Sequence, residues 1–515
     1  MRLLKSYTGG RWVEGDTRTP LFNPTTEETI AEVATGDVDV AATLEHARSC
    51  GGPALREMSF ADRGRLVGAI AKTLHAHRDE LLELSTTTGG NTRGDAKFDV
   101  DGGIGTLSYY AKLGETLGDG CVLGDGEVEK LGRGARFSGR HIRVPLTGAA
   151  VHINAFNFPA WGMTEKAAVA LLAGMPVVTK PATSTAPVVC RMVEILIEAG
   201  VLPDGVLSLV LGGGSDLLEH VTGQDVVAFT GSADTGILIR SRENVLRQSV
   251  RVGVEADSLN ACVYGPDVGP DSETHDMFVR DVVREMTQKA GQKCTAIRRI
   301  FVPKEKLETV AAELRDRLAE TRVGDPALRE VGMGPLATAS QLQDVKAGIE
   351  RIAGDGRFLL GDGGRGSLHG VDSERGYFVS PVLLLADDAA AAAAVHEHEV
   401  FGPVATIMPY DGTATAATEL VRLGNGGLVS SIYTDDANFA VTVTLGIAPF
   451  HGRVHIGSAK IIEYPLGPGA VPPQLVHGGP GRAGGGEELG GLRGMSFYMQ
   501  RTAVQGYTPL LDKLA

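Results

Sequence analysis

The spacing of apolar residues in the first part of the chain predicts short strands followed by long helices. Residues 1–36 alternate apolar and polar side chains in short runs separated by turn residues, which is typical of strands. Residues 38–49 and 61–84 carry apolar side chains three and four positions apart, so each run is predicted to form one amphipathic helix. Residues 97–113 predict a third helix in spite of their glycines.

The pattern then changes twice before the main sheets begin. Residues 117–134 are rich in glycine and charge and are interpreted as an exposed connection, whereas 136–144 alternate and predict a strand with one wet face. The chain ends with a Pro- and Gly-rich stretch at 465–494 and one last strand at 495–504. A strand such as 136–144, apart from the core sheets, is suited to pairing with a neighbour's sheet edge.

From residue 148 onward predicted strands and helices alternate, which indicates parallel sheets and an α/β fold class. The first block is predicted to have strands at 149–153, 177–180, 206–211, 226–230 and 249–254. The second block is predicted to have strands at 260–264, 299–302, 378–385 and 404–410. Ligands of such sheets bind beyond the carboxyl ends of the strands, so polar residues there are candidates for function.

Composition and charge limit the classes of function. The chain has 515 residues, of which 43% are hydrophobic, enough for several cores. A formal net charge of −14 argues against nucleic acid or an anionic membrane surface as a partner. Five widely spaced cysteines, the lack of a signal peptide and the lack of a long apolar run predict a cytoplasmic protein with reduced thiols and no membrane span.

Cys294 lies on a turn between a predicted helix at 274–289 and the strand at 299–302. A thiol next to a helix end and to cationic neighbours such as Lys293 can have a lowered pKa and act as a nucleophile. A lone cysteine is, however, more often a half-buried structural residue. The residues elsewhere in the sequence decide between these two interpretations.

Two polar residues at strand ends are candidates for chemistry at a thiol. Glu255 follows the strand at 249–254, where it can act as a general base with a raised pKa or simply form a salt bridge. Asn157 follows the strand at 149–153, where its amide can donate to an oxyanion or cap the next helix.

Other strand ends are candidates for nucleotide binding. Lys180 can hydrogen-bond a ribose or a phosphate there, or can be an ordinary solvated lysine. Gly231 and Ser232 form a turn into a helix whose free N–H groups can hold a phosphate, although Ser232 can equally be a plain N-cap. His396 and His398 have no accompanying third ligand motif, so no metal site is predicted.

The order and spacing of these residues together resemble the aldehyde dehydrogenase superfamily. The motifs that carry the resemblance are Phe156-Asn-Phe-Pro, Lys180-Pro-Ala, Phe229-Thr-Gly-Ser, Glu255, Gly291-Gln-Lys-Cys and Glu399-Val-Phe-Gly-Pro-Val. The resemblance extends from about Gly10 to the last strand, which is nearly the whole chain.

The resemblance implies that Cys294 is the nucleophile that attacks an aldehyde. Hydride transfer would leave a thioester, and the Asn157 side chain with the Cys294 N–H would hold the oxyanion. Glu255 would activate the water that releases the acid. The family's common Glu-Leu-Gly-Gly-Lys-Ser-Pro segment reads Glu255-Ala-Asp-Ser-Leu-Asn here, so the glutamate is kept without the glycines.

The resemblance also implies a nicotinamide dinucleotide. Lys180 would contact the adenosine ribose or its phosphate, Ser232 the pyrophosphate and Glu399 the nicotinamide ribose. Thr183 stands where NAD-preferring relatives often have a glutamate, which would repel a 2′-phosphate, so NADP is predicted with NAD as the alternative. The full set of expected cofactor contacts is Phe156, Lys180, Thr183, Gly231, Ser232, Glu399 and Phe401.

The implied architecture is an aldehyde dehydrogenase-like α/β fold with three parts. A Rossmann-type coenzyme domain would comprise residues 1–122 and 145–257, and an α/β catalytic domain residues 258–464. A small β oligomerisation arm with a C-terminal wrap would comprise 123–144 and 465–515. Pairing of the arms would give a homodimer or a dimer of dimers.

Three longer strings resemble a narrower branch of the family: 152–163, 254–260 and 291–299. That branch oxidises ring-cleavage semialdehydes of aerobic aromatic degradation, such as 3,4-dehydroadipyl-CoA semialdehyde or its phenylacetyl-CoA counterpart. The expected substrate is therefore a small aldehyde, in particular a CoA-thioester semialdehyde. Two alternatives stay open: a CoA-acylating dehydrogenase, in which CoA resolves the thioester, and a non-catalytic binding protein on the same fold.

Overall fold

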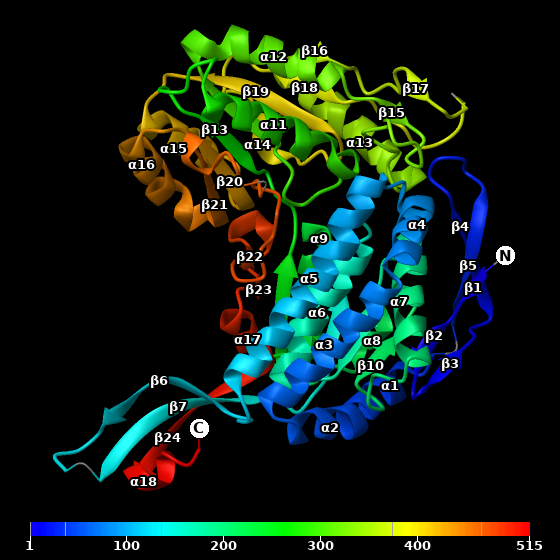
Figure 1. Cartoon of the computed structure of the whole chain (residues 1–515), viewed down its shortest axis with the longest axis vertical. Coiled ribbons are helices and arrows are strands. Elements are labelled where there is room, and N and C mark those ends of the chain that lie inside the picture. The colour runs from blue at the N-terminus through cyan, green and yellow to red at the C-terminus, as the bar shows by residue number, and fades with distance from the viewer. Residues whose placement is uncertain (1, 37, 135, 373, 465, 515) are drawn as a thin grey trace.

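The computed structural model describes residues 2–36, 38–134, 136–372, 374–464 and 466–514 (Figure 1). The predicted domain limits at residues 1, 465 and 515 lie outside this described part. Two large sheets with their covering helices form the body, and a narrow β arm projects from it (Figure 1). The fold class predicted from the alternating pattern is confirmed.

The first large sheet has the strand order β12-β11-β8-β9-β10-β2-β3, and the strands from β12 to β10 are parallel. Its strands are β2 (Ser6–Thr8), β3 (Arg11–Val13), β8 (Ala150–Ile153), β9 (Val177–Lys180), β10 (Leu207–Leu209), β11 (Val226–Thr230) and β12 (Arg251–Glu255). Apolar runs form these strands because both faces are buried: Ala150 packs into one core and Val151 into another. The chain order reverses between β8 and β11, so a crevice lies at their carboxyl ends.

The helices around this sheet begin in the N-terminal part of the chain. They are α1 (Val40–His46), η1 (Ala47–Gly51), α2 (Gly52–Glu57), α3 (Phe60–Ala76), α4 (Arg78–Gly89), α5 (Arg93–Leu117), α6 (Pro159–Ala173), α7 (Ala186–Glu198), α8 (Ser215–Glu219), α9 (Ala233–Arg240) and α10 (Glu243–Arg247). The helix predicted at 61–84 is in fact two, because the backbone leaves the helical conformation at His77. The glycines of α5 serve its packing: a Cβ on Gly102 would lie 2.4 Å from the Trp161 ring of α6.

The second large sheet has the order β16-β18-β19-β14-β13-β20-β21 and is parallel except at β16. Its strands are β13 (Ala261–Tyr264), β14 (Arg299–Pro303), β16 (Arg357–Leu360), β18 (Val382–Leu385), β19 (Val404–Tyr410), β20 (Gly427–Tyr433) and β21 (His451–Gly457). Its helices include α11 (Glu273–Thr287), α12 (Leu307–Ala319), α13 (Ala339–Ile352), α14 (Ala393–Glu397), α15 (Ala414–Arg422) and α16 (Ala437–Ile447). The sequence did not predict β20 or β21. Ser430 and Ser431 interrupt the apolar run of β20, although both are buried.

The arm is a three-stranded antiparallel sheet in the order β24-β7-β6. Its strands are β6 (Leu123–Lys130), β7 (Phe137–Pro145) and β24 (Met499–Tyr507). The prediction of a plain connection at 117–134 was therefore wrong, because β6 gains order from pairing with β7 rather than from an apolar pattern. The last predicted strand begins later than expected, since α17 (Leu492–Tyr498) precedes β24.

Smaller elements complete the described residues. An N-terminal sheet contains β1 (Arg2–Leu4), β5 (Thr29–Thr35) and β4 (Thr17–Phe22), and two further strand pairs are β15 (Val323–Gly324) with β17 (Leu368–His369) and β22 (Val476–Gly478) with β23 (Glu487–Leu489). Among the helices described, none combines the length and the apolar character that crossing a bilayer requires.

Candidate active site

The turn that carries Cys294 has an uncommon backbone. Lys289, Ala290 and Gly291, which follow α11 after Gln288, have φ values of 56°, 51° and 69°. Two consecutive non-glycine residues in the left-handed region cost free energy, and the surrounding structure must hold them there. At Gly291 a side chain is excluded altogether, because a Cβ would lie 2.1 Å from the carbonyl oxygen of Gly402.

Two buried side chains next to the second large sheet hold this turn. The Asn260 amide donates to the carbonyl oxygens of Cys294 and Ala296, each at 2.8 Å. The Arg298 guanidinium donates to the carbonyl oxygens of Gly402 at 2.7 Å and Gly291 at 2.9 Å. Cys294 therefore occupies a fixed position. Neither Asn260 nor Arg298 was predicted as an anchor. Both side chains bond to backbone carbonyl oxygens, which are distant in sequence or lie within the turn.

Cys294 lies where two cavities meet. The larger has a volume of about 660 Å³ and its lining includes Cys294 and seven other predicted site residues: Phe156, Asn157, Gly231, Ser232, Glu255, Glu399 and Phe401. The smaller has a volume of about 40 Å³, and its lining combines apolar and aromatic side chains with Cys294, Asn157 and Glu255. The structure thus brings together the residues predicted for chemistry.

The Asn157 side chain faces the turn from the opposite side. It is 9% exposed, and its Nδ2 donates to the carbonyl oxygen of Gln292 at 3.0 Å. An amide nitrogen carries two protons, so this bond fixes the orientation and leaves the second N–H available.

His477 is a site residue that the sequence did not predict. Its Nε2 lies 3.1 Å from Glu255 Oε2 and 3.9 Å from Cys294 Sγ. It belongs to β22, which was interpreted as part of the surface wrap, and it is 183 positions from Cys294. Its only sequence signal is a histidine in a Gly-rich stretch, which by itself does not indicate a site.

The His477 and Glu255 side chains form a buried ion pair, each 3% exposed. Burial alone would raise the pKa of Glu255, but the His477 charge and the Lys166 charge outweigh it and lower that pKa to about 2. Burial opposes the charge on His477, but the Glu255 carboxylate outweighs it and raises the His477 pKa. The predicted raised pKa of Glu255 was therefore wrong, because it assumed an apolar site without a cationic partner.

The Cys294 thiol is not activated by its sequence neighbour. Burial and then the Glu255 carboxylate raise its pKa well above the usual value, contrary to the lowered pKa predicted from nearby cations. The Lys293 ammonium does not oppose this effect, because it bonds Glu285 Oε2 at 2.5 Å and Gln288 Oε1 at 2.7 Å. Cys294 is thus a neutral thiol in the resting site.

A second group of buried charges lies behind Glu255. The Lys166 ammonium is 3.3 Å from Glu165 Oε1 and 3.1 Å from Glu488 Oε2. Glu488 is the partner of His477 in the β22–β23 pair, and Glu165, Glu255 and Glu488 each offer a carboxylate oxygen within 4.8 Å of the others. Burial raises the Glu165 pKa to about 7, so that group can exchange a proton near neutral pH.

The start of α9 faces the larger cavity, and two of its N–H groups already have acceptors. Ser232 caps α9 and its Oγ accepts from the Thr235 N–H at 3.3 Å. Ser232 is thus an N-cap, and it also lines the cavity; its contact with a phosphate stays a prediction. The next N–H, of Ala233, donates to Asp257 Oδ1 at 3.1 Å, so a carboxylate sits at the positive end of this helix.

Glu399 and two aromatic rings lie on the other side of the larger cavity. Glu399 accepts from the Ser258 N–H at 2.9 Å and lies 3.4 Å from Arg298 Nη2. Burial raises its pKa to about 7. The Phe156 and Phe401 rings meet edge to face with centroids 5.9 Å apart, which forms an apolar wall beside the carboxyl group.

Lys180 and Thr183 lie apart from the other predicted cofactor residues. Their neighbour Ala182 lines the larger cavity, but neither of them is among its described lining residues. The Lys180 ammonium donates to the Pro181 carbonyl oxygen at 3.1 Å, and burial lowers its pKa. A Cβ on Gly214 would lie 3.2 Å from Lys180 Cδ, so the lysine extends along the Gly-rich loop after β10.

The two histidines near Glu399 have separate environments. His396 Nδ1 lies 3.0 Å from Arg299 Nη1, and its Nε2 is 2.7 Å from the Ala389 carbonyl oxygen. His398 lines the larger cavity. The structure does not place the two imidazoles around a common point among the described metal-ligating groups.

Comparisons with known proteins match nearly the whole chain. Residues 12–504 match the aldehyde dehydrogenase family. The chain is 45% identical over 480 residues to a 3,4-dehydroadipyl-CoA semialdehyde dehydrogenase of Aromatoleum evansii, which covers 93% of both chains. It is 30% identical over 511 residues to a betaine aldehyde dehydrogenase of Cereibacter sphaeroides, covering 98% of this chain and 95% of the relative.

Solved structures show the same fold. A betaine aldehyde dehydrogenase of Staphylococcus aureus in complex with NAD+ superposes with a TM-score of 0.83 at 25% identity, over 98% of this chain and 95% of that one. A 3,6-anhydro-L-galactose dehydrogenase superposes with a TM-score of 0.85 at 22% identity, over 98% and 100%, which supports the fold alone.

Proposed function

This chain belongs to the aldehyde dehydrogenase family, and from that premise we propose that Cys294 oxidises an aldehyde to its carboxylic acid through a covalent thioester. The observation that carries the proposal is the position of the Cys294 thiol. It lies at the junction of an aromatic cavity and a dinucleotide-sized cavity, with the Asn157 amide and the Glu255 carboxylate also lining both. The chain is an oxidoreductase of the NAD(P)-dependent class.

The first step needs a thiolate. The resting thiol is neutral, and the nearby acceptor for its proton is the Glu255 carboxylate of the His477–Glu255 pair. Attack of the sulfur on the aldehyde carbon forms a C–S bond and turns the carbonyl oxygen into an oxyanion. The free N–H of Asn157 and the Cys294 backbone N–H are the proposed donors to that oxyanion.

The cavity residues fit a nicotinamide dinucleotide. Ser232 and the start of α9 can hold a phosphate, and Glu399 can accept from ribose hydroxyls. When bound, the nicotinamide accepts the hydride that leaves the substrate carbon. Phe156 and Phe401 would restrict water on that side, since their rings close one wall.

The final step is hydrolysis of the Cys294 thioester. Glu255 is ionised at neutral pH, so it can accept a proton from an attacking water. The positive charge of His477 compensates the negative charge of the Glu255 carboxylate. Lys166 and Glu165 stand behind it and can carry the proton away, since the Glu165 pKa is about 7. Retention of Glu255 argues against CoA as the acyl acceptor, because an acylating enzyme needs no water-activating base.

For the cofactor we propose NADP rather than NAD. Thr183 is neutral and can donate to a 2′-phosphate, and the Lys180 ammonium lies three positions before it. The adenosine end would then lie beyond the described lining of the larger cavity, next to Ala182. Relative rates with the two dinucleotides test this preference directly.

For the substrate we propose a CoA-thioester semialdehyde from aromatic degradation. The support is the 45% identity over 93% of the chain to an enzyme named for such a semialdehyde. The aromatic lining of the smaller cavity, with Phe98, Phe158 and Trp161, accepts an apolar carbon chain ahead of the aldehyde. A spectrophotometric screen for NADPH with free and CoA-linked semialdehydes, and with Cys294→Ala as the control, tests both reaction and substrate. Turnover without added CoA is expected, and turnover that requires CoA would favour the acylating reaction.

We propose the same three-part organisation as the family. Residues 1–122 and 145–257 would bind the coenzyme, 258–464 would carry the thiol, and 123–144 with 465–515 would form the oligomerisation arm. Support comes from the exposed apolar side chains of the arm, among them Phe137 at 46% and Tyr507 at 57%. Light scattering is expected to give a homodimer or a dimer of dimers.

A further inference from the structure

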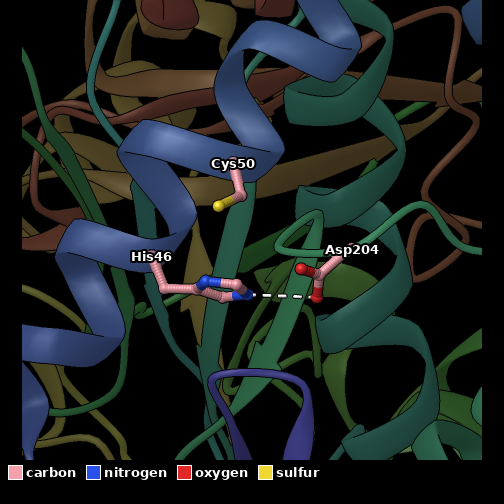
Figure 2. Close-up of side chains that lie close together, drawn as sticks. All are labelled: His46, Cys50 and Asp204. Atoms are coloured by element: carbon pink, nitrogen blue, oxygen red, sulfur yellow. Dashed lines mark hydrogen bonds and ion pairs between the residues drawn. The ribbon is translucent and has the colours of Figure 1, made fainter.

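A second group of potential metal ligands lies outside the active site, on the surface between α1 and the loop before β10. The group consists of His46, Cys50 and Asp204 (Figure 2). One ligand atom from each residue lies within 4.8 Å of the other two. The three side chains point toward one another from two separate segments of the chain (Figure 2). We propose that they bind one divalent transition-metal ion of the Zn²⁺ class.

The ligand types select this class of ion. An imidazole nitrogen, a thiolate sulfur and a carboxylate oxygen form a set that Zn²⁺ accepts, whereas Mg²⁺ and Ca²⁺ prefer oxygen alone. Binding would release the Cys50 thiol proton to solvent, and the thiolate and the Asp204 carboxylate together would balance the two positive charges. A neutral His46 imidazole supplies the third ligand.

The spacing is close to what a tetrahedral ion needs. Zn–N distances of about 2.0 Å and Zn–S distances of about 2.3 Å place tetrahedral ligands roughly 3.3–3.6 Å apart. His46 Nε2 is already 3.1 Å from Asp204 Oδ1. The remaining separations, at most 4.8 Å, need only a small adjustment of the exposed Cys50 and Asp204 side chains.

The two backbone segments that carry the ligands are closely packed. Residues Ala47–Gly51 form a π-helical turn, in which Cys50 follows His46 by four positions. Gly51 packs directly on Gly205: a Cβ on Gly51 would lie 2.1 Å from the Gly205 carbonyl oxygen. A Cβ on Gly205 would in turn lie 3.0 Å from Cys50 Cβ. Because Asp204 directly precedes Gly205, this contact fixes the spacing between the two ligand segments.

The fourth position faces solvent. The side chain of Asp204 is 67% exposed and that of His46 is 21% exposed, so water can complete the coordination. A bound ion would tie α1 to the loop before β10, at the outer side of the first sheet. Its role would be a structural brace, since the site is separate from the cavities around Cys294.

The test must exclude the active site, because Glu255, Cys294 and His477 form a similar ligand group. We would titrate the full-length Cys294→Ala protein with Co²⁺ and follow the sulfur-to-cobalt charge-transfer absorption. One equivalent with this band is expected. Adding Cys50→Ala should abolish the band, whereas adding Cys121→Ala, which removes the other exposed cysteine, should leave it unchanged.

A second measurement covers any variant that folds poorly. Zn²⁺ is expected to raise the Tm of the Cys294→Ala protein and of its Cys121→Ala derivative, but not of its Cys50→Ala or Asp204→Asn derivatives. Circular dichroism without metal establishes that each variant is folded. A sulfur-to-cobalt band that survives Cys50→Ala, or no Co²⁺ binding by the folded Cys294→Ala protein, overturns the proposal.

Discussion

His477 and Glu255 form a buried ion pair, with Nε2 and Oε2 3.1 Å apart, beside the Cys294 thiol. The pair joins two parts of the chain that are far apart in sequence: Glu255 ends a strand of the first sheet, and His477 belongs to the Gly-rich segment after the second sheet. Assembly of the thiol site therefore depends on the C-terminal segment as much as on the two large sheets.

Replacing His477 tests whether the pair controls the proposed base. In His477→Gln the cation that lowers the Glu255 pKa is lost, while a polar side chain of similar reach remains. The acid limb of the kcat–pH profile should move to higher pH, because burial then dominates the Glu255 pKa. Steady-state rates across pH measure this shift. A uniformly lower kcat with an unchanged acid limb would assign His477 a purely structural role.

The double variant Glu255→Gln/His477→Gln is the matched control. If the two residues act as one unit, the double variant should be no slower than Glu255→Gln alone. Additive losses in kcat would mean that His477 acts on another step.

The same ion pair should make folding stability depend on pH. The Glu255 pKa is lowered from 4.5 to about 2, so its contribution is present above pH 4.5 and is lost as pH falls through about 2. The His477 pKa is raised from 6.5, so its contribution is full below pH 6.5 and is lost as pH rises through the folded value. The Tm difference between wild type and His477→Gln should thus be largest between pH 4.5 and 6.5. Differential scanning calorimetry measures this Tm difference. A Tm difference that grows toward alkaline pH would contradict the His477–Glu255 ion pair.

The location of these charges explains what the sequence could and could not predict. Glu255 ends a strand, and Asn157 and Ser232 follow strands, so the local pattern places all three at strand ends and the parallel topology brings them together. His477 has no such pattern, because β22 is short and reaches Cys294 only through a contact across 183 positions. The pKa predictions for Glu255 and Cys294 were wrong for the same reason, because both pKa values depend on charged partners in distant segments of the chain.

The fold shows the same division between local and distant information. Most strands of the first sheet could be predicted, since each is a run of apolar residues with helices on both sides. Strands β6 and β20 could not, because β6 is held by pairing with β7 and β20 contains buried serines. In β20, Ser430 Oγ lies 2.8 Å from His451 Nε2, so a tertiary contact satisfies a hydroxyl that looks unsuited to a core strand.

Asn157→Ala tests the proposed oxyanion donor. The variant loses one hydrogen bond made mainly in the transition state, so kcat should fall by about 10²–10³ with little change in KM. Single-turnover rates separate this loss from slower product release. Asn154→Ala is a useful comparison, since Asn154 is also buried but bonds Thr179 Oγ1 rather than the turn before Cys294. A larger KM with unchanged kcat would point to substrate positioning instead.

Thr183→Glu tests the cofactor preference. A carboxylate at this position would repel a 2′-phosphate, so kcat/KM with NADP should fall at least about tenfold. The kcat/KM with NAD should stay the same or increase, because a carboxylate can accept hydrogen bonds from both ribose hydroxyls. Thr183→Ser keeps the hydroxyl and serves as the control. Equal losses of kcat/KM with NADP and NAD would mean that Thr183 does not lie at the adenosine site.

Asp257 provides the last test, near the middle of the proposed dinucleotide. Its carboxylate accepts from the Ala233 N–H at 3.1 Å, at the start of α9, where the pyrophosphate would bind. Two anionic groups at one helix end repel each other, so the Asp257 charge should weaken dinucleotide binding.

Asp257→Asn is therefore expected to lower the Kd for NADP several-fold by calorimetry, since the amide oxygen can still accept from Ala233. The difference from wild type should shrink with added salt, because salt screens the repulsion. Asp234→Asn removes a charge from the same cavity without removing the contact to Ala233, and separates a general charge effect from a local one. Weaker binding by Asp257→Asn would mean that the carboxylate supports the site and that the pyrophosphate lies away from α9.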